Sequence, residues 1–233
     1  MKFSPNDNYT SERSDSKRRD KERMYELFAQ VARAMSSPHR LELLDLLVQA
    51  PRTVQQLSKE ANMKVGNTSQ HLQRLKQARL VAESREGVHI TYSIADNSVA
   101  RLWLKLREVG TKQLAEVEQA LDAYRNHRHD FVQVSAEEIR EKVRNGKVTL
   151  IDVRPMEEYR AGHLPGARSL PLEEVESRLS ELPPDRTVVA YCRGPYCVFA
   201  DEALQFLQHR GYNVARLEDG VAEWQELGYE LEK

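Results

Sequence analysis

Two cysteines, Cys192 and Cys197, are the residues of this 233-residue sequence with the clearest chemical potential. Cys192 follows the apolar run 187–191 and opens a short loop containing glycine and proline, after which apolar residues recur at helical spacing. A strand, a tight loop and a helix N-terminus in this order direct backbone N–H groups toward an anion in the mouth of the loop. Those dipoles, together with Arg193, would favour the thiolate form of Cys192. We therefore predict a reactive thiol rather than a cysteine that only packs in a core.

The neighbours of this thiol limit its chemistry. A Cys-x5-Arg phosphatase loop needs an arginine six residues after the nucleophile to clamp phosphate, and that position is Val198. A thiolate in a small anion-binding loop instead suits sulfane-sulfur transfer, in which Cys192 attacks a polarised S–S bond and carries a persulfide. The loop residues that would cradle the sulfur are Arg193, Gly194, Tyr196, Cys197 and Val198.

Cys197 has two interpretations that the sequence leaves open. It is either a resolving thiol that attacks the Cys192 persulfide, or a packed residue at the start of a helix. An extended loop would separate the two Cα atoms beyond the limit of about 7 Å for a disulfide, whereas a curled loop would not.

Composition narrows the classes of protein to which this chain can belong. Two cysteines are too few for a disulfide framework, and they exclude cysteine-based metal fingers. No apolar stretch approaches the roughly 20 residues of a membrane-spanning helix, and the first residues are polar, unlike a secretion signal. We therefore expect a cytoplasmic protein without membrane contact.

Charge is divided unevenly along the chain, although the net charge is only −1. Residues 1–129 contain 22 Lys and Arg against 16 Asp and Glu, whereas residues 130–233 contain 13 and 20. The net charge of +6 favours a polyanionic partner for the first part, and that of −7 disfavours one for the second. Because the residue pattern also changes near residue 130, we expect two domains.

Helical periodicity dominates the first part of the chain. Residues 1–20 have few apolar side chains, so we expect a disordered tail there. Apolar residues then recur at steps of three and four over 21–36, and the following Ser-Pro pair begins a second helix. Thr53 and Gln56 have capping-box spacing and predict a short third helix.

The next helical segment has one packing face and one polar face. The packing face comprises Val65, Thr68, Leu72 and Leu75, and the polar face comprises Asn67, Gln70, His71 and Arg74. Amide, imidazole and guanidinium groups pair with base edges and phosphates in a DNA major groove. Taken alone, a merely solvated helix face explains this stripe equally well.

A β-hairpin follows, with residues 80–85 and 88–94 on either side of a Glu-Gly turn. It would form the wing of a winged helix-turn-helix. Residues 24–95, with Ser-Pro-His-Arg-Leu at 37–41 and Asn-Thr-Ser-Gln-His-Leu at 67–72, resemble the ArsR/SmtB-type bacterial regulators. We expect DNA contacts from Asn67, Thr68, Ser69, Gln70, His71, Arg74, Arg85 and His89.

Residues 98–126 contain no proline and place an apolar stripe along one helical face. A continuous helix of that length cannot bury its stripe in so small a domain, so we expect it to pair with its copy in a homodimer, with Gly110 as a point where it could bend. In the family that this sequence resembles, the members that sense metals bind them through pairs of cysteines or through sets of Asp, His and Glu. The first kind is excluded because no cysteine precedes Cys192, whereas His127, His129 and Asp130 leave the second kind open.

From Phe131 onward, short β-branched runs alternate with helical segments. Strands are expected over 148–153, 168–170, 187–191 and 214–217, and helices near 136–145, 173–181, 198–210 and 219–227. This alternation predicts a mainly parallel sheet with helices on its faces, and such sheets bind ligands at the carboxyl ends of their strands. Cys192 lies at one of these ends.

This second part resembles a rhodanese domain. The resemblance rests on Leu-Ile-Asp-Val-Arg at 150–154, Gly-His-Leu-Pro-Gly-Ala at 162–167, the Cys192 loop, and the Asp-Gly pair at 219–220 followed by Trp224. It implies that Cys192 is the nucleophile and that the loop amides hold the transferred sulfur. The loop departs from the usual pattern because Gly194 comes second and Pro195 third, which removes one amide donor. Structural roles are expected for Asp152 and His163, an ion pair that fixes the turn from sheet to helix for Arg154 with Glu158, and a core position for Trp224.

Together these patterns predict two domains after the tail. Residues 21–129 would form a mainly α winged helix-turn-helix domain with a β-hairpin wing, and residues 130–233 an α/β rhodanese-like domain with a mainly parallel sheet. We expect a bacterial regulator that binds a double-stranded DNA operator as a homodimer. It would carry sulfane sulfur from a small donor on Cys192 as a persulfide, either as a sensor of reactive sulfur or for transfer to a thiol acceptor, without a cofactor. Two alternatives remain: a sulfurtransferase whose helical domain is mainly a dimeriser, and a metal-responsive repressor with an inert rhodanese domain.

Overall fold

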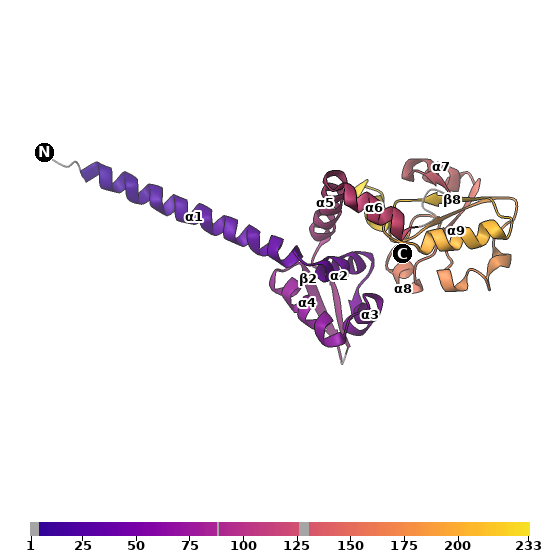
Figure 1. The fold of residues 1–233 in the computed structure, drawn as a ribbon, viewed down its shortest axis with the longest axis horizontal. Coiled ribbons are helices and arrows are strands. Elements are labelled where there is room, and N and C mark those ends of the chain that lie inside the picture. The colour runs from indigo at the N-terminus through magenta and orange to yellow at the C-terminus, as the bar shows by residue number, and fades with distance from the viewer. Residues whose placement is uncertain (1–4, 88, 126–130) are drawn as a thin grey trace. The chain divides into compact units, whose positions relative to one another are not determined.

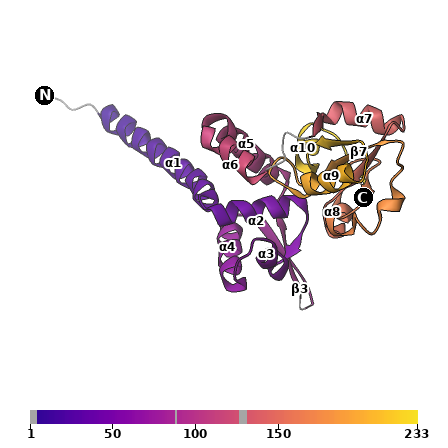
Figure 2. The same ribbon diagram turned by 45° about the vertical axis from the view of Figure 1, so that its right-hand side comes forward.

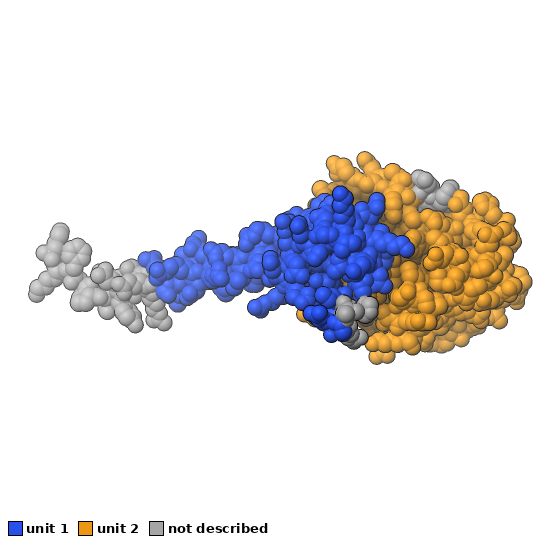
Figure 3. All heavy atoms as spheres, turned by 90° about the horizontal axis from the view of Figure 1, so that it is seen from below, with its two compact units in different colours: residues 1–44, 53–95 blue, residues 45–52, 96–233 orange. Residues whose placement is uncertain are grey.

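The computed structural model describes residues 5–87, 89–125 and 131–233. The chain divides into two compact units, which Figure 3 shows in different colours. The first comprises residues 1–44 and 53–95, and the second comprises residues 45–52 and 96–233. The second unit therefore includes the helices after residue 96, which the sequence pattern places with the DNA-binding domain.

The first unit has the winged helix-turn-helix fold that the sequence predicts. Its helices are α1 (Pro5–Met35), α2 (Pro38–Gln49, whose last turn belongs to the second unit), α3 (Val54–Glu60) and α4 (Val65–Gln77). Strands β1 (Arg52–Thr53), β2 (Val81–Glu86) and β3 (His89–Ile94) form a sheet of order β1-β3-β2, in which β2 and β3 are antiparallel. The hairpin lies beside α3 and α4 (Figure 2). The capping box of Thr53 and Gln56 at the start of α3 is confirmed.

Leucines form the core of this unit. The fully buried members are Leu43, Leu44, Leu57, Leu72 and Leu75. Thr68, Leu72 and Leu75 confirm the packing face predicted for α4, whereas Val65, the first residue of the helix, is exposed. The remaining face of α4 is thereby left outside the core.

Helix α1 begins at Pro5, so it includes most of the segment for which composition predicts a disordered tail. Two salt bridges support the part of the helix from Arg18 to Glu26. Arg18 pairs with Glu22 at i,i+4 and Arg23 pairs with Glu26 at i,i+3. Such pairs stabilise a helix locally without burying apolar area, which the composition argument does not count.

The long helix expected over 98–126 is two helices, α5 (Asn97–Gln113) and α6 (Ala115–Tyr124). The break is at Leu114, which has extended backbone with φ −116° and ψ 98°, and not at Gly110. After the break Leu121 is buried and Arg125 is paired, so packing outweighs the continuity of one helix. Within the part of the chain that the structure describes, none of the helices has the length and apolar character to span a membrane.

The sheet of the second unit is parallel, as predicted, and has five strands in the order β4-β8-β7-β5-β6. Its strands are β4 (Val132–Val134), β5 (Val148–Asp152), β6 (Arg168–Ser169), β7 (Thr187–Tyr191) and β8 (Val214–Leu217). Its helices are α7 (Ala136–Arg144), α8 (Met156–Ala161), α9 (Phe199–His209) and α10 (Val221–Glu226).

Alternating residues of the central strands build two cores, one on each face of the sheet. Ile151, Val188 and Ala190 pack with α9 on one face, and Leu150 and Val189 pack with α7 and α10 on the other. Figure 1 shows α7 and α9 on opposite sides of β8. The sheet is therefore covered on both faces, so a reactive site can only lie at an edge of the sheet.

The sequence pattern does not predict the short elements β4 and α8. The helix expected near 173–181 is replaced by two 3-10 turns, Leu172–Glu174 and Leu179–Glu181. Apolar spacing of three suits a 3-10 turn as well as an α-helix, so periodicity alone could not separate the two.

Candidate functional site

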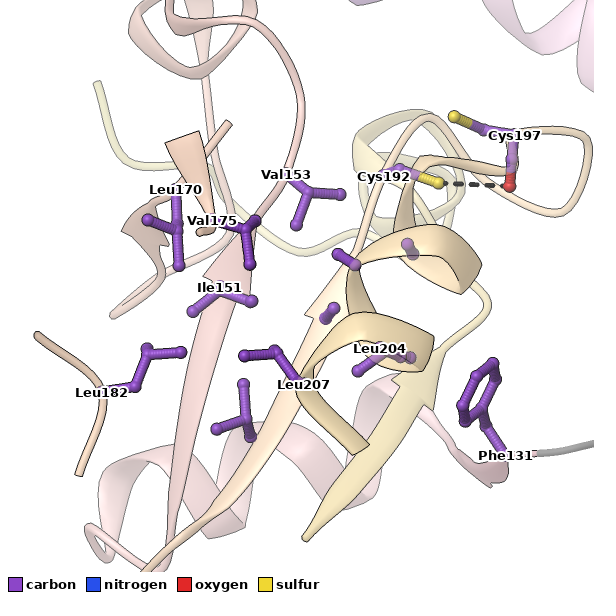
Figure 4. Packing of buried hydrophobic residues seen from close by; sticks show 14 residues of the cluster. Phe131, Ile151, Val153, Leu170, Val175, Leu182, Cys192, Cys197, Leu204 and Leu207 are labelled. Carbon is purple, nitrogen blue, oxygen red and sulfur yellow. Dashed lines mark hydrogen bonds between the residues drawn. The ribbon is translucent and has the colours of Figure 1, made fainter. Parts of the chain in front are cut away.

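The thiol loop joins the central strand β7 to α9, at the carboxyl edge of the sheet. Both cysteines lie inward of the loop surface: Cys192 is 1% exposed and Cys197 is 8% exposed. Figure 4 shows them beside the core residues that pack against α9. The position after a central strand agrees with the sequence prediction, and Cys192 is buried as a member of the core on this face of the sheet.

The loop is curled, which decides between the two geometries that the sequence leaves open. The Cys197 N–H donates to the Gly194 carbonyl at 3.3 Å and closes a turn. The Cys192 thiol can donate to the Cys197 carbonyl oxygen, with the sulfur 3.4 Å from it (Figure 4). As a thiolate, Cys192 accepts hydrogen bonds from the Cys197 thiol and from the Ala200 N–H. Cys192 therefore contacts the backbone of Cys197 within one turn.

Three charged residues lie behind the thiols. The Arg216 guanidinium of β8 places Nη2 3.9 Å from the Cys192 sulfur and 3.1 Å from the Cys197 carbonyl oxygen. Arg216 also donates to Asp201 at 2.7 Å, and Arg125 donates to both oxygens of the same carboxylate at 2.8 and 3.0 Å. All of these groups are buried.

This environment separates the pKa values of the two thiols. Burial alone would raise the pKa of Cys192, but the Cys197 hydrogen bond, the Arg216 charge and the Ala200 N–H together lower it to about 7. The hydrogen bond to Cys192, together with burial, raises the pKa of Cys197 well above its usual value. A thiolate and a thiol in the same turn are suited to nucleophilic attack followed by resolution.

Arg193, which we expected to activate Cys192, has another position. Its guanidinium donates to Glu158, with Nε 2.9 Å from Oε1, and it lies over the Phe199 ring at 5.3 Å from the centroid. Arg52 binds the same Glu158 carboxylate. The backbone N–H of Arg193 acts on the second cysteine instead, since it favours the Cys197 thiolate. The side-chain cation beside Cys192 is Arg216.

Other loop residues shape the cradle. Gly194 has a φ of 111°, where a side chain would be strained, and a Cβ there would lie 3.0 Å from the Glu223 carboxylate. The Tyr196 hydroxyl lies 2.7 Å from the Thr111 hydroxyl of α5, and Pro195 accepts a hydrogen bond from Arg125 at 2.9 Å. Val198 has helical backbone and caps α9 without a side-chain hydrogen bond. The rim of the loop is therefore bonded to α5 and to the end of α6.

The polar residues to which we gave structural roles are buried and paired. Arg154 binds Asp152 through three hydrogen bonds of 2.6 to 3.1 Å and Gly162 at 2.9 Å. The expected partner Glu158 is 3.9 Å from Arg154 and bonds more closely to Arg52 and Arg193. His163 stacks on Tyr159, and Trp224 belongs to the core.

The expected DNA contacts divide into exposed and buried residues. Asn67, Gln70 and Arg74 are exposed on α4, and Ser69 and His71 are half-buried. Thr68 is a correction, because its side chain is fully buried and its hydroxyl donates to the Lys64 carbonyl. Arg85 is exposed near the hairpin tip, and His89 begins β3.

His71 is the most constrained of these residues. Its ring lies 5.4 Å from that of His39, and its Nδ1 is buried without a hydrogen-bond partner in the described chain. Burial, followed by the charges of His39, Arg40 and Arg74, lowers the pKa of His71. A neutral imidazole beside two arginines is suited to a hydrogen bond with a ligand.

Sequence reasoning missed Arg125, Asp201 and Arg216. They are far apart along the chain and form no motif, so only folding brings them together. One signal was available: Arg216 interrupts the apolar strand Val-Ala-Arg-Leu, and a buried charge is rarely kept in a strand without a partner.

The metal alternative rests on residues outside the described part of the chain, because His127, His129 and Asp130 fall within residues 126–130. Elsewhere, in the residues that the structure does describe, no three His, Cys, Asp or Glu side chains are grouped closely enough to hold a metal ion.

Comparison with known proteins matches both halves. The description "Bacterial regulatory protein, arsR family" matches residues 37–83, and "Rhodanese-like domain" matches residues 135–227. The HTH-type transcriptional regulator Rv0324 of Mycobacterium tuberculosis is 41% identical over 205 residues, which cover 88% of this chain and 90% of the relative. A protein named sulfurtransferase from Allochromatium vinosum is 37% identical over 82 residues, 35% of this chain and 75% of that protein.

Among solved structures, this chain is similar to the homodimeric winged helix-turn-helix DNA-binding domain of Mb0332 from Mycobacterium bovis. The two are 35% identical, with a TM-score of 0.39, and the match covers 40% of this chain and 87% of that one.

Proposed function

Because the chain belongs to the ArsR family of bacterial regulators and carries a C-terminal rhodanese-like domain, we propose that it is a cytoplasmic DNA-binding repressor or activator that senses sulfane sulfur through Cys192. The observation that carries the proposal is a curled loop in which the Cys192 sulfur lies 3.4 Å from the Cys197 carbonyl oxygen and 3.9 Å from the buried Arg216 guanidinium. An inert module would need neither the thiol pair nor the buried cation beside it.

The chemistry proceeds in two balanced steps. The Cys192 thiolate attacks the outer sulfur of a persulfide RSSH, the S–S bond breaks, and RS⁻ leaves while Cys192 becomes a persulfide. The Cys197 thiolate, formed as its proton passes to solvent, then attacks the inner sulfur and forms the Cys192–Cys197 disulfide. Hydrosulfide leaves with the displaced electron pair and takes up a proton to give H₂S. The donor's sulfane sulfur is the oxidant throughout, so no cofactor is required.

The proposed regulator acts as a homodimer on a twofold operator. Large apolar side chains are left exposed on α1, α5 and the ends of α6: Met24, Tyr25, Leu27, Phe28, Leu102, Leu106, Val109, Leu114 and Tyr124. A second copy would remove them from water, and two copies would present two α4 helices to successive DNA half-sites. The proposed DNA contacts are Asn67, Ser69, Gln70, His71, Arg74, Arg85 and His89.

A second candidate function is a sulfurtransferase that passes the Cys192 sulfur to a free thiol, with the helical half serving as dimeriser. The similarity to the Allochromatium sulfurtransferase favours it. The two functions differ in whether Cys197 displaces the sulfur as hydrosulfide or an external thiol receives it, and in whether DNA is bound.

The test is the affinity for the chain's own upstream DNA, measured before and after polysulfide treatment, for the wild type and for Cys192→Ser. If the chain is a regulator, its affinity for this DNA should fall as salt increases, with a slope of log affinity against log salt concentration of about 0.9 for each phosphate neutralised. Polysulfide treatment should change the DNA affinity only in the wild type. Absence of salt-dependent binding would overturn the regulatory proposal, and so would an equal response of Cys192→Ser. Turnover of polysulfide without DNA binding would favour the sulfurtransferase.

A further inference from the structure

We propose that Arg216 is the residue that holds Cys192 in its reactive form, as the buried cation that balances the thiolate. The inference rests on the proposed function only for its biological use, since the state of the thiol is measurable without any sulfur donor. No motif of either domain marks Arg216; its role follows from where β8 places it.

The geometry suits this role. The Arg216 side chain is fully buried, and Nη2 lies within 3.9 Å of the Cys192 sulfur. The same nitrogen donates to the Cys197 carbonyl oxygen at 3.1 Å, at the end of the loop. Arg216 therefore contacts the reacting sulfur and also fixes the turn that brings Cys197 to it.

The balance of buried charge points the same way. Arg216 and Arg125 share the single carboxylate of Asp201, so two cations face one buried anion. Glu218 also binds Arg125, at 3.0 Å, but its side chain is 37% exposed and its charge is screened by water. A thiolate at Cys192 supplies the missing negative charge inside the core.

The groups around Cys192 come from four elements. Arg216 comes from β8, Asp201 from α9, Arg125 and Tyr124 from the end of α6, and Cys197 from the loop. Guanidinium groups stay protonated across the range in which thiols titrate. Asp201 acts against the thiolate by its negative charge, so removing Arg216 and removing the Asp201 charge should have opposite effects.

The experiment uses the full-length reduced protein and follows thiolate ultraviolet absorbance against pH, with the Cys192→Ser form of each variant subtracted. The variants are Arg216→Met, Arg216→Lys and Asp201→Asn. Arg210→Met is the matched control, because Arg210 is an exposed arginine that pairs with Glu176 at the far end of α9. The wild type should titrate near 7.

Arg216→Met should raise the midpoint toward the value of about 8.5 of a free thiol without reaching it, because the Cys197 hydrogen bond and the Ala200 N–H remain, and should lower the thiolate fraction at neutral pH severalfold. Arg216→Lys should retain most of the effect, Asp201→Asn should lower the midpoint, and Arg210→Met should leave it unchanged. A residue that only supported the fold would not produce shifts of opposite sign.

Equal midpoints in the wild type, Arg216→Met and Asp201→Asn would overturn the proposal. If Arg216→Met fails to fold, judged by near-ultraviolet circular dichroism, Asp201→Asn decides, and an unchanged or raised midpoint refutes it. Alkylation followed by tryptic digestion identifies which cysteine titrates. Trypsin cleaves after Arg193 and so separates the Cys192 peptide from the Cys197 peptide. A normal titration without sulfur uptake would refute the proposed function and leave the role of Arg216 intact.

Discussion

The hydroxyl groups of Thr111 and Tyr196 lie 2.7 Å apart, so that α5 is bonded directly to the thiol loop. Arg107 of the same helix lies over the Tyr196 ring, 4.7 Å from its centroid. Arg125, at the end of α6, donates to the Pro195 carbonyl next to it. A loop held at two successive residues cannot rearrange around a new S–S bond without disturbing these helices, which carry the exposed apolar side chains of the proposed dimer.

Thr111→Val combined with Tyr196→Phe should weaken the response to sulfur while sparing sulfur uptake. The hydrogen bond lost is worth about 1 kcal/mol, so the change in DNA affinity on polysulfide treatment should shrink by up to about fivefold. The measurement is the ratio of DNA affinities before and after treatment. Tyr212→Phe is the control, because its hydroxyl donates to the carbonyl oxygens of Leu179 and Leu182, in and after the second 3-10 turn. An unchanged ratio in the double variant would show that coupling runs elsewhere.

Cys197→Ser should trap the first step of the proposed chemistry. Without the second thiol, the Cys192 persulfide has no partner to resolve it, and the intact protein should gain the mass of one sulfur. The wild type should instead lose two hydrogens as the disulfide forms, and Cys192→Ser should do neither. Mass spectrometry of the treated proteins distinguishes the three results. A stable persulfide in the wild type would assign Cys197 to packing alone.

Glu158→Gln should destabilise the second unit by about 3 kcal/mol, because it leaves the Arg52 and Arg193 guanidiniums facing a neutral amide in a buried position. Urea unfolding measures the loss. Glu157→Gln is the matched control, since that neighbour is exposed. Equal midpoints for the two variants would mean that the buried cations find other partners.

The fold was predictable where local rules and tertiary packing agree. The capping box of Thr53, the apolar face of α4 and the strand Thr187–Tyr191 all have the structure that their sequence favours. Leu114 shows the opposite case: nothing in its neighbourhood breaks a helix, and the break arises from burial of Leu121 and pairing of Arg125. Such terms involve residues distant in sequence, which periodicity does not register.

The candidate site was predictable to the same extent. The thiol position follows from strand, loop and helix order, but the cation beside it does not, because Arg193 is adjacent in sequence and Arg216 is adjacent only in space. Thr68 shows how a motif misleads at single positions: its neighbours face outward, whereas its own place on the helix is in the core.

Exposed residues of α4 should carry DNA recognition. Arg74→Ala should weaken binding uniformly across sequences and reduce the salt slope by about one, as expected for a phosphate contact. Gln70→Ala should cost about 1 to 3 kcal/mol at one base position and relax specificity there. Arg101→Ala on α5 is the control for lost positive charge. Binding isotherms at several salt concentrations test all three. Identical behaviour of Arg74→Ala and Arg101→Ala would refute the assignment to α4.

Sulfur uptake should depend on pH through Cys192. Because its pKa is lowered to about 7, the thiolate fraction rises as pH increases through neutrality and levels off above it. The rate of persulfide formation should therefore rise by about tenfold between one pH unit below and one pH unit above the midpoint of the protein that is measured. For a free thiol with a pKa of about 8.5, the rate would still be rising steeply above neutrality.

Stopped-flow rates in Cys197→Ser, where the persulfide accumulates, give the profile after correction for donor ionisation. That variant lacks the Cys197 hydrogen bond, so its midpoint should lie above that of the wild type but below that of a free thiol, because Arg216 and the Ala200 N–H remain. A midpoint at the free-thiol value would mean that Cys197 alone activates Cys192.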